Sequence, residues 1–108
     1  MSDAGGGIDV DEVVRIVLRC PSVARMAPGT AVEVATYLPG RRVPGVRLVD
    51  GAVEVHVVAH YGQRLPDVAD EVRRALARAV GEQRVEIFID DLDLDAAPAL
   101  EVAAGRSR

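Results

Sequence analysis

Apolar residues recur at helical spacing near the beginning of the chain. Asp9 precedes this stretch and stands where a helix N-cap side chain is expected, with Glu12 three residues later. Pro21 disfavours helical geometry at Cys20, so we expect a helix over residues 10–19. The apolar stripe of this helix consists of Val10, Val13, Val14, Val17 and Leu18.

A second amphipathic stretch begins at Pro66, which suits the first turn of a helix because that position needs no amide. Acidic residues gather near its start and arginines near its end, as the helix dipole favours, and Gly81 is a natural stop. We therefore expect a helix over residues 66–80. Its apolar stripe consists of Leu65, Val68, Ala69, Val72, Leu76, Ala79 and Val80.

The strongest strand signal is a hairpin centred on Asp50 and Gly51. Both residue types tolerate the positive φ angles of a type I′ turn, and valine-rich segments flank them at 46–49 and 52–58. Residues 84–91 alternate between apolar and polar and are expected to form the last strand.

Weaker signals of extended structure lie before the hairpin. Residues 31–38 alternate loosely, Pro39 and Gly40 mark a turn, and another extended piece starts at Val43. Two short strands are compatible with this pattern, and the strand status of residues 31–38 stays open.

The strand, helix, strand order from Val53 to Asp91 predicts a crossover unit with parallel strands. With the hairpin before it, the chain is expected to be an α+β protein, with a mixed three- to four-stranded sheet and both helices packed on one face. Phe88 would then lie half-exposed on the opposite, open face. The side chains expected on that face are Glu54, His56, Val58, His60, Glu86, Phe88 and Asp90.

Composition fits one small folded domain. Hydrophobic residues make up 49% of the 108, with 19 valines but only three aromatics, so the core must be built from small branched side chains. We expect a flexible leader over residues 1–8, one domain over 9–92 and a loose tail over 93–108.

Charge and cysteine content narrow the possible partners and location. The formal charge of −4, without any basic block, disfavours nucleic acid as a partner. Cys20 is the only cysteine, which excludes an intrachain disulfide and a four-cysteine zinc site and fits a reducing cytoplasm. No apolar run approaches the ~18 residues of a membrane span and no secretory signal is visible, so direct membrane insertion is not expected.

No catalytic arrangement or cofactor motif is evident. His56 and His60 would stand ~13 Å apart on a strand, too far to share one metal ion, and two solvent-facing histidines are the simpler interpretation. Ser22 lies in no nucleophile motif, and Cys20 at the end of an apolar helix face fits a buried structural thiol. We therefore expect no enzymatic activity, no cofactor and no metal.

One small basic cluster remains. Arg41 and Arg42 lie in the turn between Pro39 and Pro44, with Arg47 nearby. Arginine suits bidentate recognition of carboxylates or phosphates, so this loop is a candidate for docking an acidic partner. The simpler alternative is a solvated, charged loop. No GxxG motif occurs, so the loop that clamps nucleic acid in KH-type domains is missing.

At Tyr61 and Gly62 an expected strand ends in an aromatic-Gly pair, and an apolar-Pro-acidic-Val-Ala string then opens an amphipathic helix. This arrangement resembles the alkaline shock protein family, also called general-stress Gls-type proteins. Similar matches are the Pro-Ser-Val-Ala string at 21–24, the valine strand at 53–58 and the closing strand at 85–92. The string at 40–46 is similar to the variant found in high-GC Gram-positive bacteria, the actinobacteria, whose codon bias would also explain arginine without lysine.

The resemblance spans about residues 8–92, and it departs from the family pattern at Ser22, where glycine is usual. It implies a non-enzymatic cytoplasmic protein of the cell-envelope stress response. Such a protein would self-associate and be held at the inner face of the membrane through a membrane-embedded partner. Candidate contact residues are Phe88, Val58, His56 and His60 on the open face, and Arg41, Arg42 and Arg47 near the turn.

Two other functions stay open at this point. One is a small ligand- or metal-binding domain that uses His56 and His60. The other, less well supported by charge and motifs, is RNA binding on a KH-like α/β frame.

Overall fold

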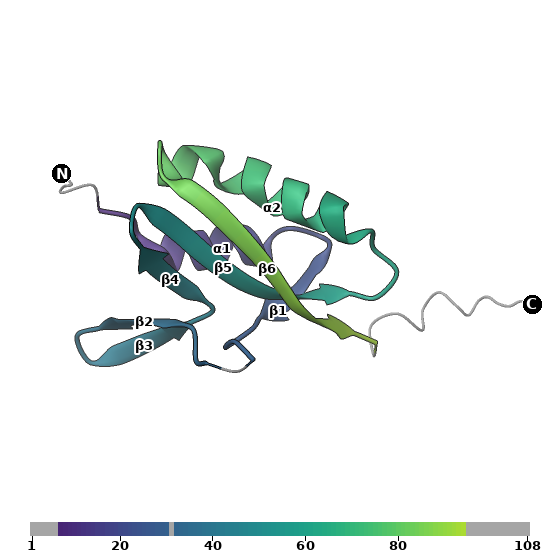
Figure 1. Ribbon diagram of the computed structural model, residues 1–108, viewed down its shortest axis with the longest axis horizontal. Helices are drawn as coiled ribbons and strands as arrows, with labels where there is room; N and C mark the ends of the chain where they lie inside the picture. Colours follow the sequence, from purple (N-terminus) through teal and green to yellow (C-terminus); the bar gives the residue numbers. More distant parts are fainter. Residues whose placement is uncertain (1–6, 31, 95–108) are drawn as a thin grey trace, which may run out of the picture.

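A mixed β-sheet covered on one face by two helices forms the body of the molecule (Figure 1). The computed structural model describes residues 7–30 and 32–94, so most of the expected leader and tail lie outside the described residues. The elements are α1 (Val10–Leu18), β1 (Val23–Met26), β2 (Ala35–Leu38), β3 (Arg41–Pro44), β4 (Val46–Val49), β5 (Ala52–His60), α2 (Leu65–Val80) and β6 (Arg84–Asp93).

Strand β5 is the centre of the four-stranded sheet and is buried along almost its whole length. Strand β6 pairs with one edge of β5 in parallel, as the crossover order predicts. The other edge is shared, because β4 pairs with residues 52–55 of β5 and β1 pairs with residues 57–59, both antiparallel. The predicted α+β class and mixed sheet are therefore confirmed.

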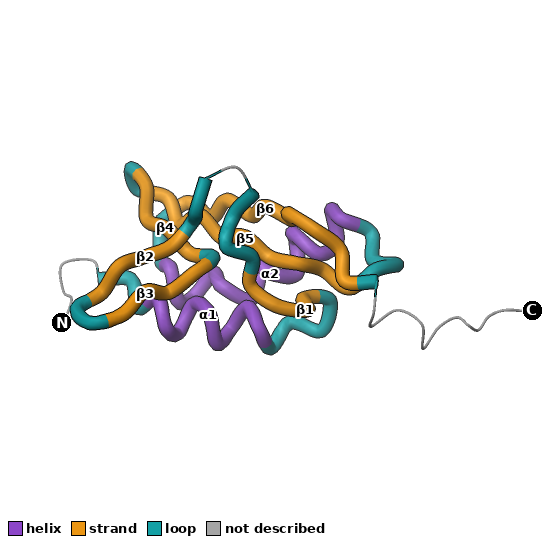
Figure 2. The backbone as a smooth tube through the Cα atoms, turned by 90° about the horizontal axis from the view of Figure 1, so that it is seen from below, coloured by secondary structure: helices purple, strands orange, loops and turns teal. Residues whose placement is uncertain are grey.

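Both helices lie on the same side of the sheet, behind it in the view of Figure 1 and together in the view of Figure 2. Asp9 caps α1 by accepting hydrogen bonds from the amides of Asp11 and Glu12, as expected. The largest fully buried side chains are valines except for Leu76, which confirms a core of small residues. Its members from the helices and β5 include Val13, Val17, Val53, Val55, Val57, Val68, Val72 and Leu76.

The hairpin between β4 and β5 forms as predicted. Asp50 and Gly51 both have positive φ angles, 46° and 78°, which is the requirement of a type I′ turn. This turn fixes the register of the two strands, so that Arg47 lies opposite Glu54.

Three features differ from the sequence-based expectations. Strand β1 was not predicted, because residues 23–26 are too short for a clear alternation and are strand only through their pairing with β5. Strand β6 ends at Asp93, so that residue belongs to the domain and not to the tail. At the other boundary, Ile8 packs against the core and is not part of a free leader.

The region of uncertain structure before the hairpin is a second, two-stranded sheet. Strands β2 and β3 pair antiparallel around Pro39 and Gly40 and project beside the main sheet (Figures 1 and 2). Gly45 connects this hairpin to β4 with a φ of 88°, and its amide and carbonyl bond to Val34 and His56. Thr36 adds a side-chain hydrogen bond to the carbonyl of Val46, at 2.6 Å.

Candidate interaction site on the open sheet face

The open face of the sheet carries a row of charged side chains around His56. His56 Nδ1 lies 2.7 Å from Asp90 Oδ2, and His56 Nε2 lies 2.9 Å from Glu54 Oε2. A carboxylate can only accept hydrogen bonds, so both contacts are satisfied when both ring nitrogens carry a proton. The geometry therefore suits an imidazolium held between two carboxylates.

Arg47 completes this charged cluster from the neighbouring strand β4. Its Nε and a terminal nitrogen donate to Glu54 Oε1 at 3.0 and 2.9 Å. Burial by itself would raise the pKa of Glu54, but the hydrogen bonds from His56 and Arg47 outweigh it and hold the pKa below the ordinary 4.5. Glu54 is thus an ionised carboxylate on a largely desolvated surface, with both oxygens bonded.

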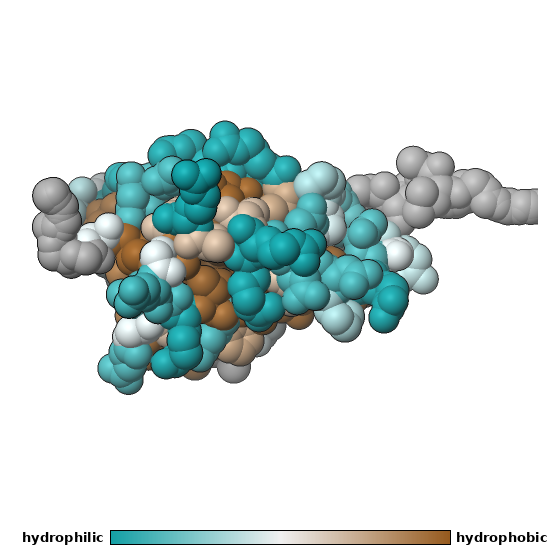
Figure 3. All heavy atoms as spheres, turned by 90° about the horizontal axis from the view of Figure 1, so that it is seen from above, coloured by the Kyte–Doolittle hydropathy of each residue, from teal (hydrophilic) through white to brown (hydrophobic). Residues whose placement is uncertain are grey.

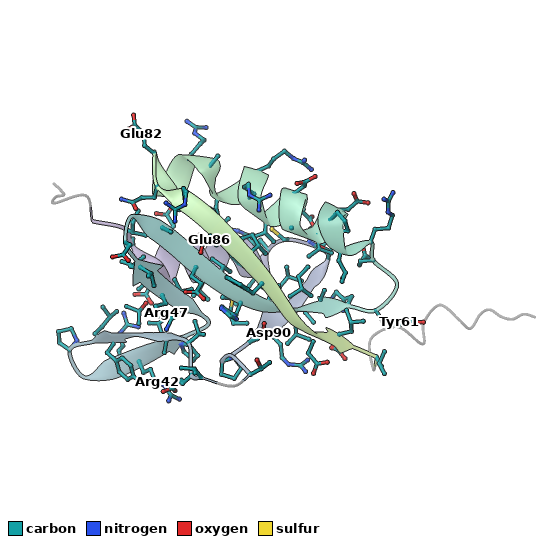
Figure 4. All side chains as sticks on the ribbon, in the orientation of Figure 1. Arg42, Arg47, Tyr61, Glu82, Glu86 and Asp90 are labelled. Atoms are coloured by element: carbon teal, nitrogen blue, oxygen red, sulfur yellow. The ribbon has the colours of Figure 1, made fainter. Side chains whose placement is uncertain are left out.

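A β-bulge in β6 places Asp90 beside His56. The register between β5 and β6 shifts at this point, since Val57 pairs with Ile89 and Val58 pairs with Asp91. The extra residue is Asp90, whose side chain stays on the open face and reaches the imidazole. In Figure 4 the labelled Arg47, Glu86 and Asp90 all lie over this face of the sheet.

Phe88 covers the ring of His56. The two side chains lie in register on β5 and β6, with ring centroids 4.5 Å apart and an interplanar angle of 13°. Phe88 is 40% exposed, whereas His56 is only 8% exposed beneath it. The aromatic ring is thus both a lid on the charged cluster and an apolar contact surface with a fixed orientation.

The other two residues proposed as contacts on this face, Val58 and His60, are not part of the charged cluster. Val58 is 5% exposed and belongs to the buried part of β5, so it offers no contact surface. His60, at the end of β5, is partly exposed and makes no bond to the cluster; its Nδ1 has no partner among the described residues. Of the apolar and aromatic candidates on the face, Phe88 alone is well exposed.

The arginines of the proposed basic loop lie in strands and are paired within the chain. Arg41 and Arg42 belong to β3, where Arg41 forms a two-nitrogen contact with Asp11 of α1 and Arg42 bonds to Glu33. The hydrogen bond with Arg41 lowers the pKa of Asp11. With Arg47 bonded to Glu54, all three arginines face carboxylates of their own chain, and the idea of a free basic loop for an acidic partner is not supported.

The remaining candidates have structural roles. The buried Cys20 thiol contacts the carbonyl of Ile16 at 3.6 Å, and burial together with the charge of Glu71 raises its pKa. Ser22 is buried and donates a hydrogen bond to Glu71, which ties the turn after α1 to α2. In the part of the chain that the structure describes, no group of three acidic, histidine or cysteine side chains is arranged to hold a metal ion.

Comparison with protein-family models, curated proteins and solved structures finds no match to this chain. The resemblance to alkaline shock proteins therefore rests on the residues quoted above. Neither described helix is long and apolar enough to cross a membrane.

Sequence reasoning placed His56, Phe88 and Asp90 on one face but did not connect them as a cluster. The pairing of Arg47 with Glu54 could have been found, because a two-residue turn at Asp50 and Gly51 puts these opposite charges directly across from each other. The contact of His56 with Asp90 depends on the parallel register and on the bulge, for which the sequence carries no local signal.

Proposed function

We propose that this protein is a non-enzymatic protein–protein interaction module of the alkaline shock type, acting in the cell-envelope stress response. In this proposal it resides in the cytoplasm, associates with itself and is held at the inner face of the membrane by a membrane-embedded partner. The partner contacts the open sheet face at Phe88. Because the partner supplies the membrane attachment, the chain itself needs no membrane-spanning helix.

The observation that carries the proposal is the position of Phe88. A large aromatic ring, 40% exposed, is fixed by stacking on His56 and is bordered by charged groups. Aromatic residues that are rigid before binding lose little conformational entropy on contact and are enriched at binding hot spots. The charged rim, which includes Glu86 and Asp90, would favour one orientation of the partner.

The same geometry argues against the alternative of a metal site on β5. Both nitrogens of His56 are bonded to carboxylates that lie on opposite sides of the ring. A metal ligand needs one of these nitrogens deprotonated and free, so binding would require the cluster to open. The net charge of −4 gives an RNA-binding function no support either.

The proposal is tested with membrane vesicles prepared from cells that express the chain. The purified protein should co-sediment with vesicles that retain their membrane proteins and not with protein-free vesicles made from the same lipids. Phe88→Glu should weaken this binding at least about tenfold, because a charged side chain replaces the apolar contact. Circular dichroism and urea unfolding verify that the variant is folded.

Leu48→Glu is the matched control. Leu48 is 48% exposed on β4, but it pairs with Val53 and so lies on the helix side of the sheet. This variant should bind the protein-containing vesicles like the original chain. Equal binding to protein-free vesicles, no binding to either preparation, or equal losses in both variants would overturn the proposal.

A further inference from the structure

Strand β6 has one unpaired edge in the described part of the chain, since its only strand partner there is β5. At its two ends, the amide of Arg84 donates to Gly51 and the carbonyl of Asp93 accepts from Tyr61, so these groups point toward β5. Backbone groups alternate in direction along a strand. Between Arg84 and the bulge at Asp90, the amides and carbonyls of Val85, Ile87 and Ile89 therefore point away from the sheet.

Two hollows lie beside this edge, between α2 and β6. One, of about 430 Å³, is lined by apolar atoms of Ala77, Val80 and Val85. The other, of about 330 Å³, is lined by Leu65, Ile89 and Leu92. Figure 3 shows hydrophobic side chains, coloured brown, that are exposed at the surface between hydrophilic side chains, coloured teal. The edge is thus bordered by unfilled apolar surface at both ends.

Charge differs between the two ends of the edge. The hollow at the beginning of β6 is bordered by Arg73, Arg84 and Glu86, and Arg84 forms an ion pair with Glu86, so the arginines leave a net positive charge there. The hollow at its end is bordered by the acids Asp90 and Asp91. A second copy related by a two-fold axis would run antiparallel and bring its acidic end against the basic end of the first. The edge is therefore complementary to itself in charge.

We propose that two copies of this chain pair antiparallel along β6, with the two-fold axis at Ile87. In this register Ile87 lies opposite Ile87 of the second copy, and Val85 lies opposite Ile89, so the outward backbone groups face one another. On the open face, Arg84 lies opposite Asp90 of the second copy. The proposal deepens the self-association within the proposed function by naming the surface and the occupant.

Neighbouring registers are less favourable. Moving the axis to Phe88 places Glu86 opposite Asp90 of the second copy, and moving it to Glu86 places two copies of Glu86 opposite each other. Like charges directly opposite across strands are destabilising. The bulge at Asp90 ends the regular part of the edge. Because the pairing consumes the same edge of both copies, it produces a closed dimer and not a fibre.

The test uses the full chain in sedimentation equilibrium, with the backbone donor at the axis removed. Ile87→Pro lacks an amide that points outward, a position where an edge strand tolerates proline. It should raise the dimer dissociation constant about 100-fold, because the hydrogen bonds across the two-fold axis are lost and the proline ring hinders the approach of the second strand. Ile87→Ala likewise removes the isoleucine side chain but keeps the backbone amide, so this variant should remain dimeric at concentrations where Ile87→Pro is monomeric.

A charge variant tests the register independently. Arg84→Glu should weaken the dimer about tenfold, because it places two carboxylates opposite each other at both ends. Arg74→Glu makes the same charge change on the exposed side of α2, away from the lining of either hollow, and should leave the dimer unchanged. Equal effects of the two variants would overturn the register.

Amide exchange separates the possible occupants of the edge. In the dimer, exchange at Val85, Ile87 and Ile89 should slow as protein concentration rises. Concentration-independent protection in a monomer would mean that the chain covers its own edge, and it would overturn the dimer. If the Ile87→Pro variant self-associates as well as the original chain, the β6 edge is not the dimer surface, and self-association itself still stands. A chain that stays monomeric at about 1 mM would overturn self-association as well, while vesicle binding through Phe88 would still be tested separately.

Discussion

The imidazole of His56 lies flat against the phenyl ring of Phe88, with centroids 4.5 Å apart and planes inclined by 13°. This contact joins the two parallel strands at the centre of the open face and places an aromatic ring above a buried ion cluster. The same ring is exposed on its other side. A stabilising contact and the proposed contact surface therefore belong to the same pair of residues.

Replacing His56 tests the ion cluster. His56→Ala removes the donor between Glu54 and Asp90 and leaves two carboxylates on a poorly solvated surface. We expect a loss of about 2–4 kcal/mol in the free energy of unfolding, measured by urea denaturation. His60→Ala is the control: Nδ1 of His60 has no partner among the described residues, and the loss should stay under about 1 kcal/mol. Equal losses would mean that the cluster adds nothing beyond side-chain packing.

Acid should weaken the fold through Glu54. Its pKa is lower in the folded protein than the ordinary 4.5, so its contribution to stability is present above pH 4.5. That contribution is lost as the pH falls below 4.5 and through the folded-state pKa. Arg47 and His56 donate to Glu54, and Glu86 lies beside it in register on β6.

Urea midpoints measured between about pH 3 and 7 should show this fall, since a native carboxylate must be protonated on acid unfolding. Glu54→Gln should be less stable than the original chain at pH 7, with a smaller further loss below pH 4.5. An unchanged acid slope in the variant would assign the acid sensitivity to other carboxylates.

Two glycines allow steric contact to be separated from backbone strain. Gly45 and Gly40 have similar positive φ angles, 88° and 77°. A Cβ on Gly45 would lie 2.9 Å from Met26 Cβ and 3.1 Å from the carbonyl oxygen of Ala27, whereas a Cβ on Gly40 meets nothing within 4 Å. Gly40→Ala should cost about 1–2 kcal/mol, from the backbone conformation alone.

Gly45→Ala carries the same backbone cost plus the displacement of β1, so its loss should exceed that of Gly40→Ala by at least about 1–3 kcal/mol. Thermal and urea unfolding of both variants measure the difference. Similar losses would show that β1 moves away without cost and that the junction of β3, β4 and β1 is loosely packed.

The bond between Ser22 and Glu71 fixes the turn after α1 onto α2. Ser22→Ala removes the buried hydroxyl and should cost about 1–2 kcal/mol in urea unfolding. Glu71→Gln retains an oxygen that accepts from Ser22, so its loss should be smaller. It also removes the charge that contributes to the raised pKa of Cys20, and faster alkylation of this thiol at a fixed pH should accompany it. No change in alkylation would contradict the electrostatic link.

Much of the fold could be predicted because its signals are local. Asp9 and Pro21 bound the first helix, Pro66 and Gly81 bound the second, and Asp50 with Gly51 specifies the hairpin. Each depends on the backbone preferences of a few neighbouring residues. Strand β1 was missed for the opposite reason, since it is strand only through hydrogen bonds to β5, more than thirty residues away.

The candidate site was predicted in part. Alternation along two strands placed His56, Phe88 and Asp90 on the open face, but the exposure of each depends on neighbours that the sequence does not specify. Val58 was expected at a contact surface and is buried, and Arg41 and Arg42 were expected in a free loop and are bonded to Asp11 and Glu33.

The sequence by itself determined the helices, the hairpin and which side chains share a face, because periodicity and turn chemistry act over a few residues. Only the tertiary structure decided that His56 lies between Glu54 and Asp90 under Phe88, and that β6 keeps an unpaired edge within the described chain. The cluster follows from the parallel register of β5 and β6 and from the bulge in it, and the unpaired edge follows from the order of the strands. Register and strand order are set by pairing between segments distant in sequence, which leaves no local mark on either segment.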